Sequence, residues 1–325
     1  MNCTNVSPVP YGLLVMQAMD MWREETYPPL PPPTPIGGGA IIGYVRGTDS
    51  IIPGHPNIPG PITTPVYYGQ VVRRNATEVV VAIRGTDGYQ EWLEDAQFPP
   101  VPYRPKLPLP PDAAGALVEQ GFWGIYRSLE LTDTHGKPIG PLAETIPILV
   151  DPDDDVVVTG HSLGAPLATY LTLDLARGPL GSWVRGCYFA SPRPGNTAFV
   201  TFFDQVVGSN YVLYNYLLDV VPTVPGEVLG YRSLSKKRVI WPQEAQADIK
   251  FGIGCSHHIV CYLAMLDYAA TMQALNPVPA GEEGSVTCIR GPRTPGKPSV
   301  AQLLADRVLK AAEQRAASPD PVHVA

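Results

Sequence analysis

The sequence predicts an α/β fold with a mostly parallel central sheet that helices cover on both faces. Short apolar runs suited to buried parallel strands alternate along the chain with segments of helical pattern. Strand–helix alternation of this kind builds a parallel sheet with both faces covered. We expect the strands at residues 156–159, 186–190 and 211–218, and the helices at residues 163–176, 196–206 and 257–275.

Composition predicts one sizeable core and argues against two classes of partner. The chain has 325 residues, of which 45% are hydrophobic, and its net charge is −7. We expect a single domain over residues 1–290 and a C-terminal tail with a short helix over residues 291–325. Phosphate binding needs clustered Lys and Arg, so no nucleic acid partner is expected. The charge also argues against electrostatic docking to anionic membranes, and no protein partner is inferred.

The N-terminal half adds further elements. Residues 10–25 have the spacing of a helix with an apolar face. Residues 66–73 and 78–84 are expected to be strands on either side of a hairpin-like turn at 74–77. Residues 118–129 are expected to be helical.

Proline is abundant, with 38 residues in the chain. Because proline removes a hydrogen-bond donor and fixes φ, long non-helical connections must be present. We expect proline-rich insertions near residues 28–65 and 98–111, and the sequence predicts no conformation for the first of them.

No signal in the sequence specifies a compartment. Arg23 is the first basic residue and follows the apolar stretch 13–21, which is the reverse of the order in a signal peptide. No apolar run approaches the ~18 residues of a membrane span. The localisation could therefore be cytoplasmic, or extracellular with the signal absent from this chain. Three glycosylation sequons are interpreted as coincidence. The five cysteines allow at most two disulfides and specify none.

The most informative segment is a Gly-x-Ser-x-Gly motif. The apolar run Val156–Val158, followed by Thr159, leads into Gly160-His161-Ser162-Leu163-Gly164, and a helical segment follows directly. This strand–turn–helix order is the nucleophile elbow of the α/β-hydrolase fold, in which residues larger than the two glycines would clash with the neighbouring strand and helix. Ser162 is the predicted nucleophile. Because Ser162 is at a helix N-terminus, the Leu163 N–H is predicted to donate to an oxyanion.

The order serine, acid, histidine predicts the other two members of a catalytic triad. Asp219 closes the apolar run 211–218 and precedes Pro222, so it lies where the acid of this fold belongs. Of the six histidines, His257 and His258 follow the acid at the start of a helical segment, and one of them should be the general base. The others lie in loops, in the elbow or in the tail: His55, His135, His161 and His323.

Two groups of residues suggest a metal site instead. The cluster Cys255, His257, His258 and Cys261 suggests zinc, but it lacks a Cys-x-x-Cys pair. The acidic run at 151–155 suggests part of a calcium loop, but the glycine and the distal glutamate are missing. We therefore expect neither a metal nor a cofactor.

The chain resembles the class 3 lipases, the fungal-lipase-like branch of the α/β-hydrolases, over roughly residues 66–275. The resemblance implies that Thr86, the residue after Arg84-Gly85, donates to the oxyanion. It also favours His257 as the base, because a tyrosine, Tyr262, follows five residues later, although His258 stays open. The motifs that carry it are Val79–Thr86, Glu91–Asp95, Gly121-Phe122 with Tyr126, Gly160–Gly164, Phe189–Asn196, Asp219–Pro222 and His257 with Tyr262.

Arg-Gly-Thr-Asp occurs twice, at 46–49 and 84–87, and only the second copy follows an apolar run fit for a buried strand. Thr86 is therefore preferred to Thr48, and Arg84 is interpreted as structural. The chain departs from the family where Glu119-Gln120 replaces the usual histidine before Gly-Phe and where Pro166 enters the elbow helix.

These residues predict a carboxylic ester hydrolase, foremost a triacylglycerol lipase, that acts through an acyl-enzyme. The alternatives are a phospholipase A1, an aryl or feruloyl esterase and, from another class, an inactive scaffold that binds without catalysis. The expected partner is a small-molecule or lipid ester substrate. Residues 89–97, close after Thr86, have the pattern of an amphipathic helix, and we expect a lid that makes transient contact with a lipid–water interface through residues 89–98. The alternative is a fixed surface helix whose apolar side packs on the core.

Overall fold

The computed structural model describes residues 7–23, 28–29, 32–48, 65–86, 99–279 and 282–294, with residues 303 and 306 of the tail. The expected lid at 89–98 and most of the tail therefore lie outside the described residues. None of the helices in this described part is both long and apolar enough to cross a membrane.

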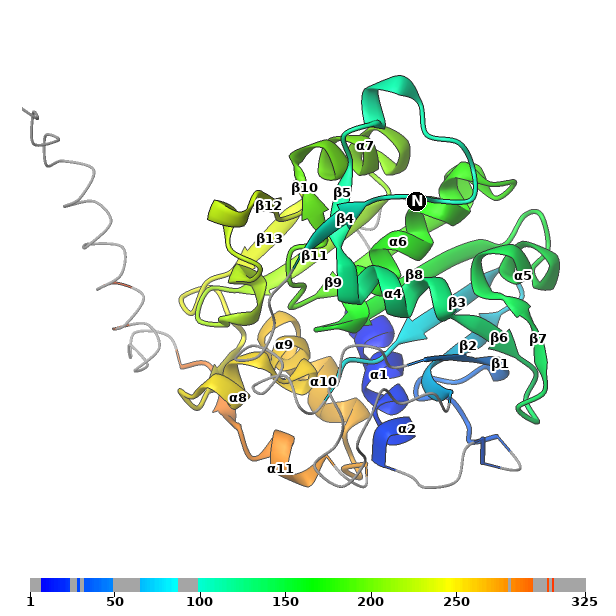
Figure 1. Ribbon diagram of the computed structural model, residues 1–325. Helices are drawn as coiled ribbons and strands as arrows, with labels where there is room; N and C mark the ends of the chain where they lie inside the picture. Colours follow the sequence, from blue (N-terminus) through cyan, green and yellow to red (C-terminus); the bar gives the residue numbers. More distant parts are fainter. Residues whose placement is uncertain are drawn as a thin grey trace, which may run out of the picture.

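A nine-stranded sheet forms the centre of the molecule, in the order β13-β11-β9-β8-β3-β2-β1-β6-β7 (Figure 1). The strands from β13 to β3 pair in parallel, whereas β2 and β6 run against the direction of the others. The predicted α/β fold is thus confirmed, with largely parallel strands. The bounds are β1 Ala40–Gly47, β2 Val66–Asn75, β3 Glu78–Ile83, β6 Glu130–Thr132, β7 Pro138–Pro141, β8 Asp155–His161, β9 Val184–Phe189, β11 Tyr211–Tyr216 and β13 Lys237–Ile240.

Both faces of this sheet are buried, which explains why its central strands are continuous apolar runs. Along β3, Val79, Val81 and Ile83 belong to one buried cluster, and Val80 and Ala82 belong to another. Helices α4 and α6 lie on the first face, and α1 and α9 lie on the second (Figure 1). Their bounds are α1 Val9–Ala18, α4 Gln120–Ser128, α6 Gly164–Arg177 and α9 Ile259–Leu266.

Two smaller sheets and several short helices complete the described fold. One small sheet has the order β12-β10-β5-β4, and the other pairs β14 with β15. The strands are β4 Pro100–Pro102, β5 Leu117–Glu119, β10 Gly195–Asn196, β12 Tyr231–Arg232, β14 Ala247–Ile249 and β15 Ile289–Pro292, and the helices are α2 Asp20–Arg23, α5 Leu142–Leu149, α7 Thr197–Val207, α8 Ile253–His257, α10 Tyr268–Ala274 and α11 Glu283–Val286.

Three segments differ from the sequence-based expectations. The proline-rich segment 28–65 contributes β1, which lies inside the main sheet between β2 and β6. The helix expected at 118–129 begins only at Gln120, because Glu119 ends β5 and its carboxylate accepts hydrogen bonds from the first N–H groups of α4. The single helix expected at 257–275 is broken twice: His258 (ψ 134°) separates α8 from α9, and the extended Asp267 (φ −153°, ψ 93°) separates α9 from α10.

A disulfide joins Cys255 in α8 to Cys288, 33 residues later. Beside it, the Lys250 N–H donates to the Cys288 carbonyl, which brings β14 and β15 together. The sequence leaves all pairings open, and among the described cysteines Cys187 and Cys261 are buried and outside any disulfide. The disulfide therefore fixes the segment that leads into His257.

Candidate active site

Ser162 occupies a sharp turn between β8 and α6. Its φ is +55°, a left-handed conformation that non-glycine residues rarely adopt. A Cβ at Gly160 would collide with the main chain of Gly164, and one at Gly164 would collide with the carbonyls of Ile83 and Arg84. The two glycines of the motif are therefore required by close approach of the main chain, as expected for a nucleophile elbow.

Ser162, His257 and Asp219 lie together in one hydrogen-bonded row. His257 Nε2 is 2.8 Å from Ser162 Oγ, and His257 Nδ1 is 2.8 Å from Asp219 Oδ2. All three side chains are buried. A carboxylate accepts hydrogen bonds, so Nδ1 carries the proton and Nε2 is left as the acceptor for the serine hydroxyl. This tautomer is the one that a general base facing Ser162 requires.

The carboxylate of Asp219 has two further donors. The Val221 N–H donates to Oδ1 at 3.0 Å, and the Tyr262 hydroxyl donates to Oδ2 at 2.7 Å. Tyr262 in turn accepts from the Tyr216 N–H at the end of β11. These bonds compensate for burial of the carboxylate and fix its direction towards His257. In the sequence the only sign of this role is the five-residue spacing from His257 to Tyr262.

The structure separates the two adjacent histidines. His257 is the last residue of α8 and points towards Ser162, whereas the main chain of His258 caps the start of α9. The His258 N–H donates to the Gly254 carbonyl, and its own carbonyl accepts from the N–H groups of Cys261 and Tyr262. The geometry therefore favours His257 over His258 as the base.

Both predicted oxyanion segments lie next to the nucleophile. A Cβ at Gly85 would be 3.0 Å from the Ser162 Cβ, so Thr86 follows a residue that touches the elbow. Arg84 is buried, and its guanidinium donates to the carbonyls of Tyr67 and Gly85, in keeping with a structural role. Leu163 is the first residue before α6, where main-chain N–H groups have no acceptor within the helix.

Thr48 and the residues that suggested a metal site make other contacts. Thr48, at the end of β1, donates its N–H to Ser128 of α4. Cys255 is in a disulfide and so cannot be a zinc ligand. In the acidic run, Asp154 binds Arg73 and Asp155 binds Arg185. Within the described ranges, no three His, Cys, Asp or Glu residues group as a metal site would require.

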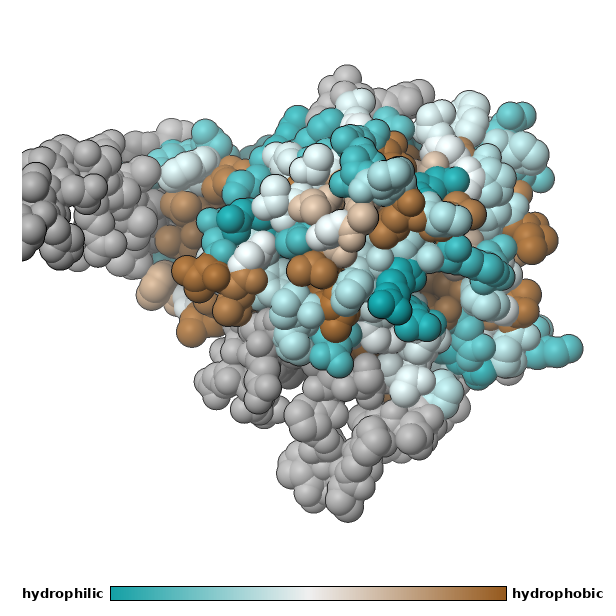
Figure 2. Space-filling view, turned by 45° about the horizontal axis from the view of Figure 1, so that its top comes forward, coloured by the Kyte–Doolittle hydropathy of each residue, from teal (hydrophilic) through white to brown (hydrophobic). Residues whose placement is uncertain are grey.

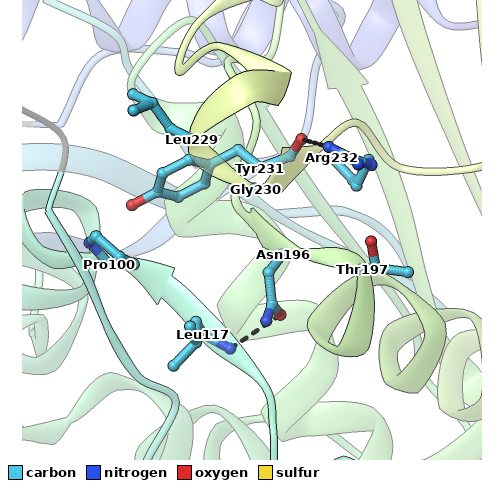
Figure 3. A pocket seen from close by; sticks show the side chains of 8 residues that line it. All are labelled: Pro100, Leu117, Asn196, Thr197, Leu229, Gly230, Tyr231 and Arg232. Atoms are coloured by element: carbon cyan, nitrogen blue, oxygen red, sulfur yellow. Dashed lines mark hydrogen bonds between the residues drawn. The ribbon is translucent and has the colours of Figure 1, made fainter.

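A separate surface pocket of about 260 Å³ lies at the small four-stranded sheet (Figure 3). Its lining holds none of Ser162, Asp219 and His257. Its central polar side chain, Asn196, is already engaged: its Oδ1 accepts from the N–H groups of Leu117 and Phe199. The hydrogen-bonded row, and not this pocket, is therefore the candidate active site.

Comparison with known proteins finds a family match over the middle of the chain. The family described as Lipase (class 3) matches residues 80–229, which include Thr86, Ser162 and Asp219. The chain is 33% identical over 167 residues to phospholipase A1-II 6 of Oryza sativa subsp. japonica, covering 46% of this chain and 40% of the relative. Residues 80–229 belong to the class 3 lipase family.

Two further comparisons each cover about half of this chain. The chain is 33% identical over 157 residues to the secreted mono- and diacylglycerol lipase A of Penicillium cyclopium, covering 48% of this chain and 46% of that protein. The Rhizomucor miehei lipase–propeptide complex aligns at 26% identity with a TM-score of 0.43, covering 52% of this chain and 51% of that chain. The chain spans about half the length of the curated relatives it matches.

Proposed function

We propose that this protein hydrolyses carboxylic esters of glycerolipids, with acylglycerols as its main substrates. The observation that carries the proposal is the row of hydrogen bonds from Ser162 through His257 to Asp219. The strained turn at Ser162 and the two flanking N–H segments add the remaining parts that acyl transfer needs. No metal or cofactor enters this mechanism.

The first half of the reaction forms an acyl-enzyme. Ser162 Oγ attacks the ester carbonyl while His257 Nε2 takes its proton, and Asp219 stabilises the imidazolium that results. The main-chain N–H groups of Thr86 and Leu163 stabilise the negative charge on the carbonyl oxygen. Collapse of the tetrahedral intermediate then breaks the C–O bond, and His257 gives its proton to the departing alcohol.

The second half repeats these steps with water as the nucleophile. His257 takes a proton from water, which attacks the acyl carbon, and the proton passes to Ser162 as the acid is released. Each protein group thus returns to its starting state. Removal of one oxyanion donor in such enzymes costs about 10²–10³ in kcat.

Two observations support a lipid ester as the substrate class. The matched relatives are named as a phospholipase A1 and a mono- and diacylglycerol lipase, and both names refer to acyl esters of glycerol. The segments that carry the acid and the base also expose apolar side chains: Val220 follows Asp219, and Phe251 and Ile253 precede His257 by a few residues. Figure 2 shows apolar side chains gathered in separate clusters on one face of the molecule.

The experiment compares wild type and Ser162→Ala on three kinds of substrate. These are p-nitrophenyl esters from acetate to palmitate, an emulsified triacylglycerol and vesicles of phosphatidylcholine. Wild type should release fatty acid from the acylglycerol, and Ser162→Ala should lose at least ~10³ in kcat. Full activity in Ser162→Ala would contradict the proposal, and faster release from phosphatidylcholine would change the substrate to phospholipid.

A further inference from the structure

His161, the residue before the nucleophile, makes a direct contact with the base that the triad mechanism does not use. Its Nε2 lies 2.6 Å from the main-chain carbonyl oxygen of His257, across 96 residues of sequence. The two imidazole rings are 4.7 Å apart between centroids, and the His161 side chain is buried. Strand β8, whose last residue is His161, therefore holds the main chain of His257 beside the nucleophile.

The chemistry of this contact specifies the tautomer of His161. A carbonyl oxygen can only accept a hydrogen bond, so the proton must lie on Nε2. Burial, and next the neighbouring His257, lower the pKa of His161 well below its ordinary value. The ring is therefore neutral, and it adds no positive charge beside the imidazolium that forms at His257 during the reaction.

The position of the acceptor explains what the bond does. His257 is the last residue of α8, a five-residue helix, and the carbonyls at a helix C-terminus have no N–H partner within the helix. At His258 the chain turns away into an extended conformation before α9 begins. The bond from His161 thus satisfies a carbonyl at the point where the main chain departs from helical geometry.

We propose that His161 is a positioning residue for the base: its Nε2–H holds the His257 main chain so that the imidazole meets both Ser162 and Asp219. The proposal rests on the function proposed above. It predicts that the donor at position 161 matters for the chemical step, because a displacement of about 1 Å at a catalytic group can cost 10²-fold in rate.

The test compares His161→Leu, which has no donor, with His161→Gln, whose amide can donate to the same carbonyl. His161→Leu should lower kcat roughly 10- to 100-fold with little change in KM. His161→Gln should recover most of that loss. The matched control is Thr172→Val, which removes a buried hydrogen bond from Thr172 Oγ1 to the Ala168 carbonyl in α6. This control should lower the melting temperature and leave kcat unchanged.

A measurement on the wild-type protein does not depend on the folding of any variant. In protein with ¹⁵N-labelled histidine, the ring of His161 should be neutral at pH 7 with its proton on Nε2. A proton on Nδ1 would overturn the proposal, and so would wild-type kcat in His161→Leu or equal losses in the leucine and glutamine variants. Ser162→Ala is assayed in parallel: activity there overturns the proposed function, whereas an inactive Ser162→Ala beside a fully active His161→Leu overturns only the role of His161.

Discussion

The Tyr262 hydroxyl donates a hydrogen bond of 2.7 Å to Asp219 Oδ2, the same oxygen that binds His257. Burial, and next the charge of Asp219, raise the pKa of Tyr262 well above its ordinary value, so the phenol keeps its proton. The tyrosine therefore acts as a permanent donor to the acid. Tyr262 lies in α9, five residues after His257. The acid and the base are therefore connected through their side chains and also through the main chain of α9.

Tyr262→Phe should lower kcat roughly 10-fold, since a hydrogen bond to a charged group is worth about 1.5–3 kcal/mol. KM should change little, because the tyrosine lies behind the acid. The Tyr216 N–H also loses its acceptor, so the melting temperature should fall. Steady-state kinetics beside a thermal melt would measure both effects. Unchanged kcat in a folded variant would show that Asp219 is held without Tyr262.

His257→Ala and His258→Ala should differ sharply in kcat. The first removes the group bound to both Ser162 and Asp219 and should lose at least ~10³ in kcat, as Ser162→Ala does. The second keeps the N–H and the carbonyl through which His258 caps α9, and it should keep most of the activity. Rates on p-nitrophenyl butyrate would distinguish the pair, and the reverse result would assign the base to His258.

Loss of the Cys255–Cys288 disulfide should destabilise the fold. In the chain-entropy model, closing a loop of 33 residues raises the free energy of the unfolded chain by about 3–4 kcal/mol. The double variant Cys255→Ala/Cys288→Ala should therefore unfold at lower urea concentration than wild type. A reductant should bring wild type to the level of the double variant and should leave the variant unchanged. Equal stability of the two proteins would contradict the expectation.

Asp154→Asn should reveal an acid-dependent contribution to stability. The hydrogen bonds that its carboxylate accepts from Arg73, at 2.8 Å and 3.0 Å, hold the pKa of Asp154 below its ordinary value of 3.8. A lowered folded-state pKa adds stability that is present above 3.8 and is lost as the pH falls through the folded-state pKa. At pH 7 the free energy of unfolding of wild type should exceed that of Asp154→Asn by roughly 1–3 kcal/mol. This difference should become smaller in acid. Urea titrations at several pH values would measure this difference in stability. A difference that does not change with pH would rule out ionisation of Asp154 as its cause.

The expected lid at residues 89–97 remains a prediction from the amphipathic pattern of Tyr89, Trp92, Leu93 and Ala96. Activity on a long-chain ester should rise sharply once the substrate exceeds its solubility limit, because the apolar face of the segment would turn towards the lipid surface. Trp92 emission should shift when detergent is added. A smooth hyperbolic rate curve with unchanged emission would favour an esterase without a lid.

The elbow and the central strands could be predicted because their signals are local. A continuous apolar run, a Gly-x-Ser-x-Gly turn and a helix follow one another within about twenty residues. Asp219 was found in the same way, from its place after an apolar strand. Elimination leaves His257 and His258, and only the resemblance to class 3 lipases, through the spacing to Tyr262, favours His257.

The features that were missed depend on contacts between distant segments. Strand β1 is flanked by glycine and proline, and its stability comes from pairing with β2 and β6. Residues 257–275 contain neither proline nor glycine, so the sequence gives no sign of the breaks at His258 and Asp267 and suggests one helix. The contacts of His161 and the pairing of Cys255 with Cys288 join residues 96 and 33 positions apart, and no local pattern encodes them.

The contact of Gly164 with the main chain of Ile83 and Arg84, and of Gly85 with Ser162, has a consequence for laboratory evolution of this protein. The oxyanion segment and the elbow have no space between them for any added carbon, so neither can be altered while the other stays in place. Libraries that randomise these glycines should yield almost no active clones. Useful variation in substrate preference should come instead from exposed positions such as Val220, Phe251 and Ile253, where a new side chain displaces only solvent.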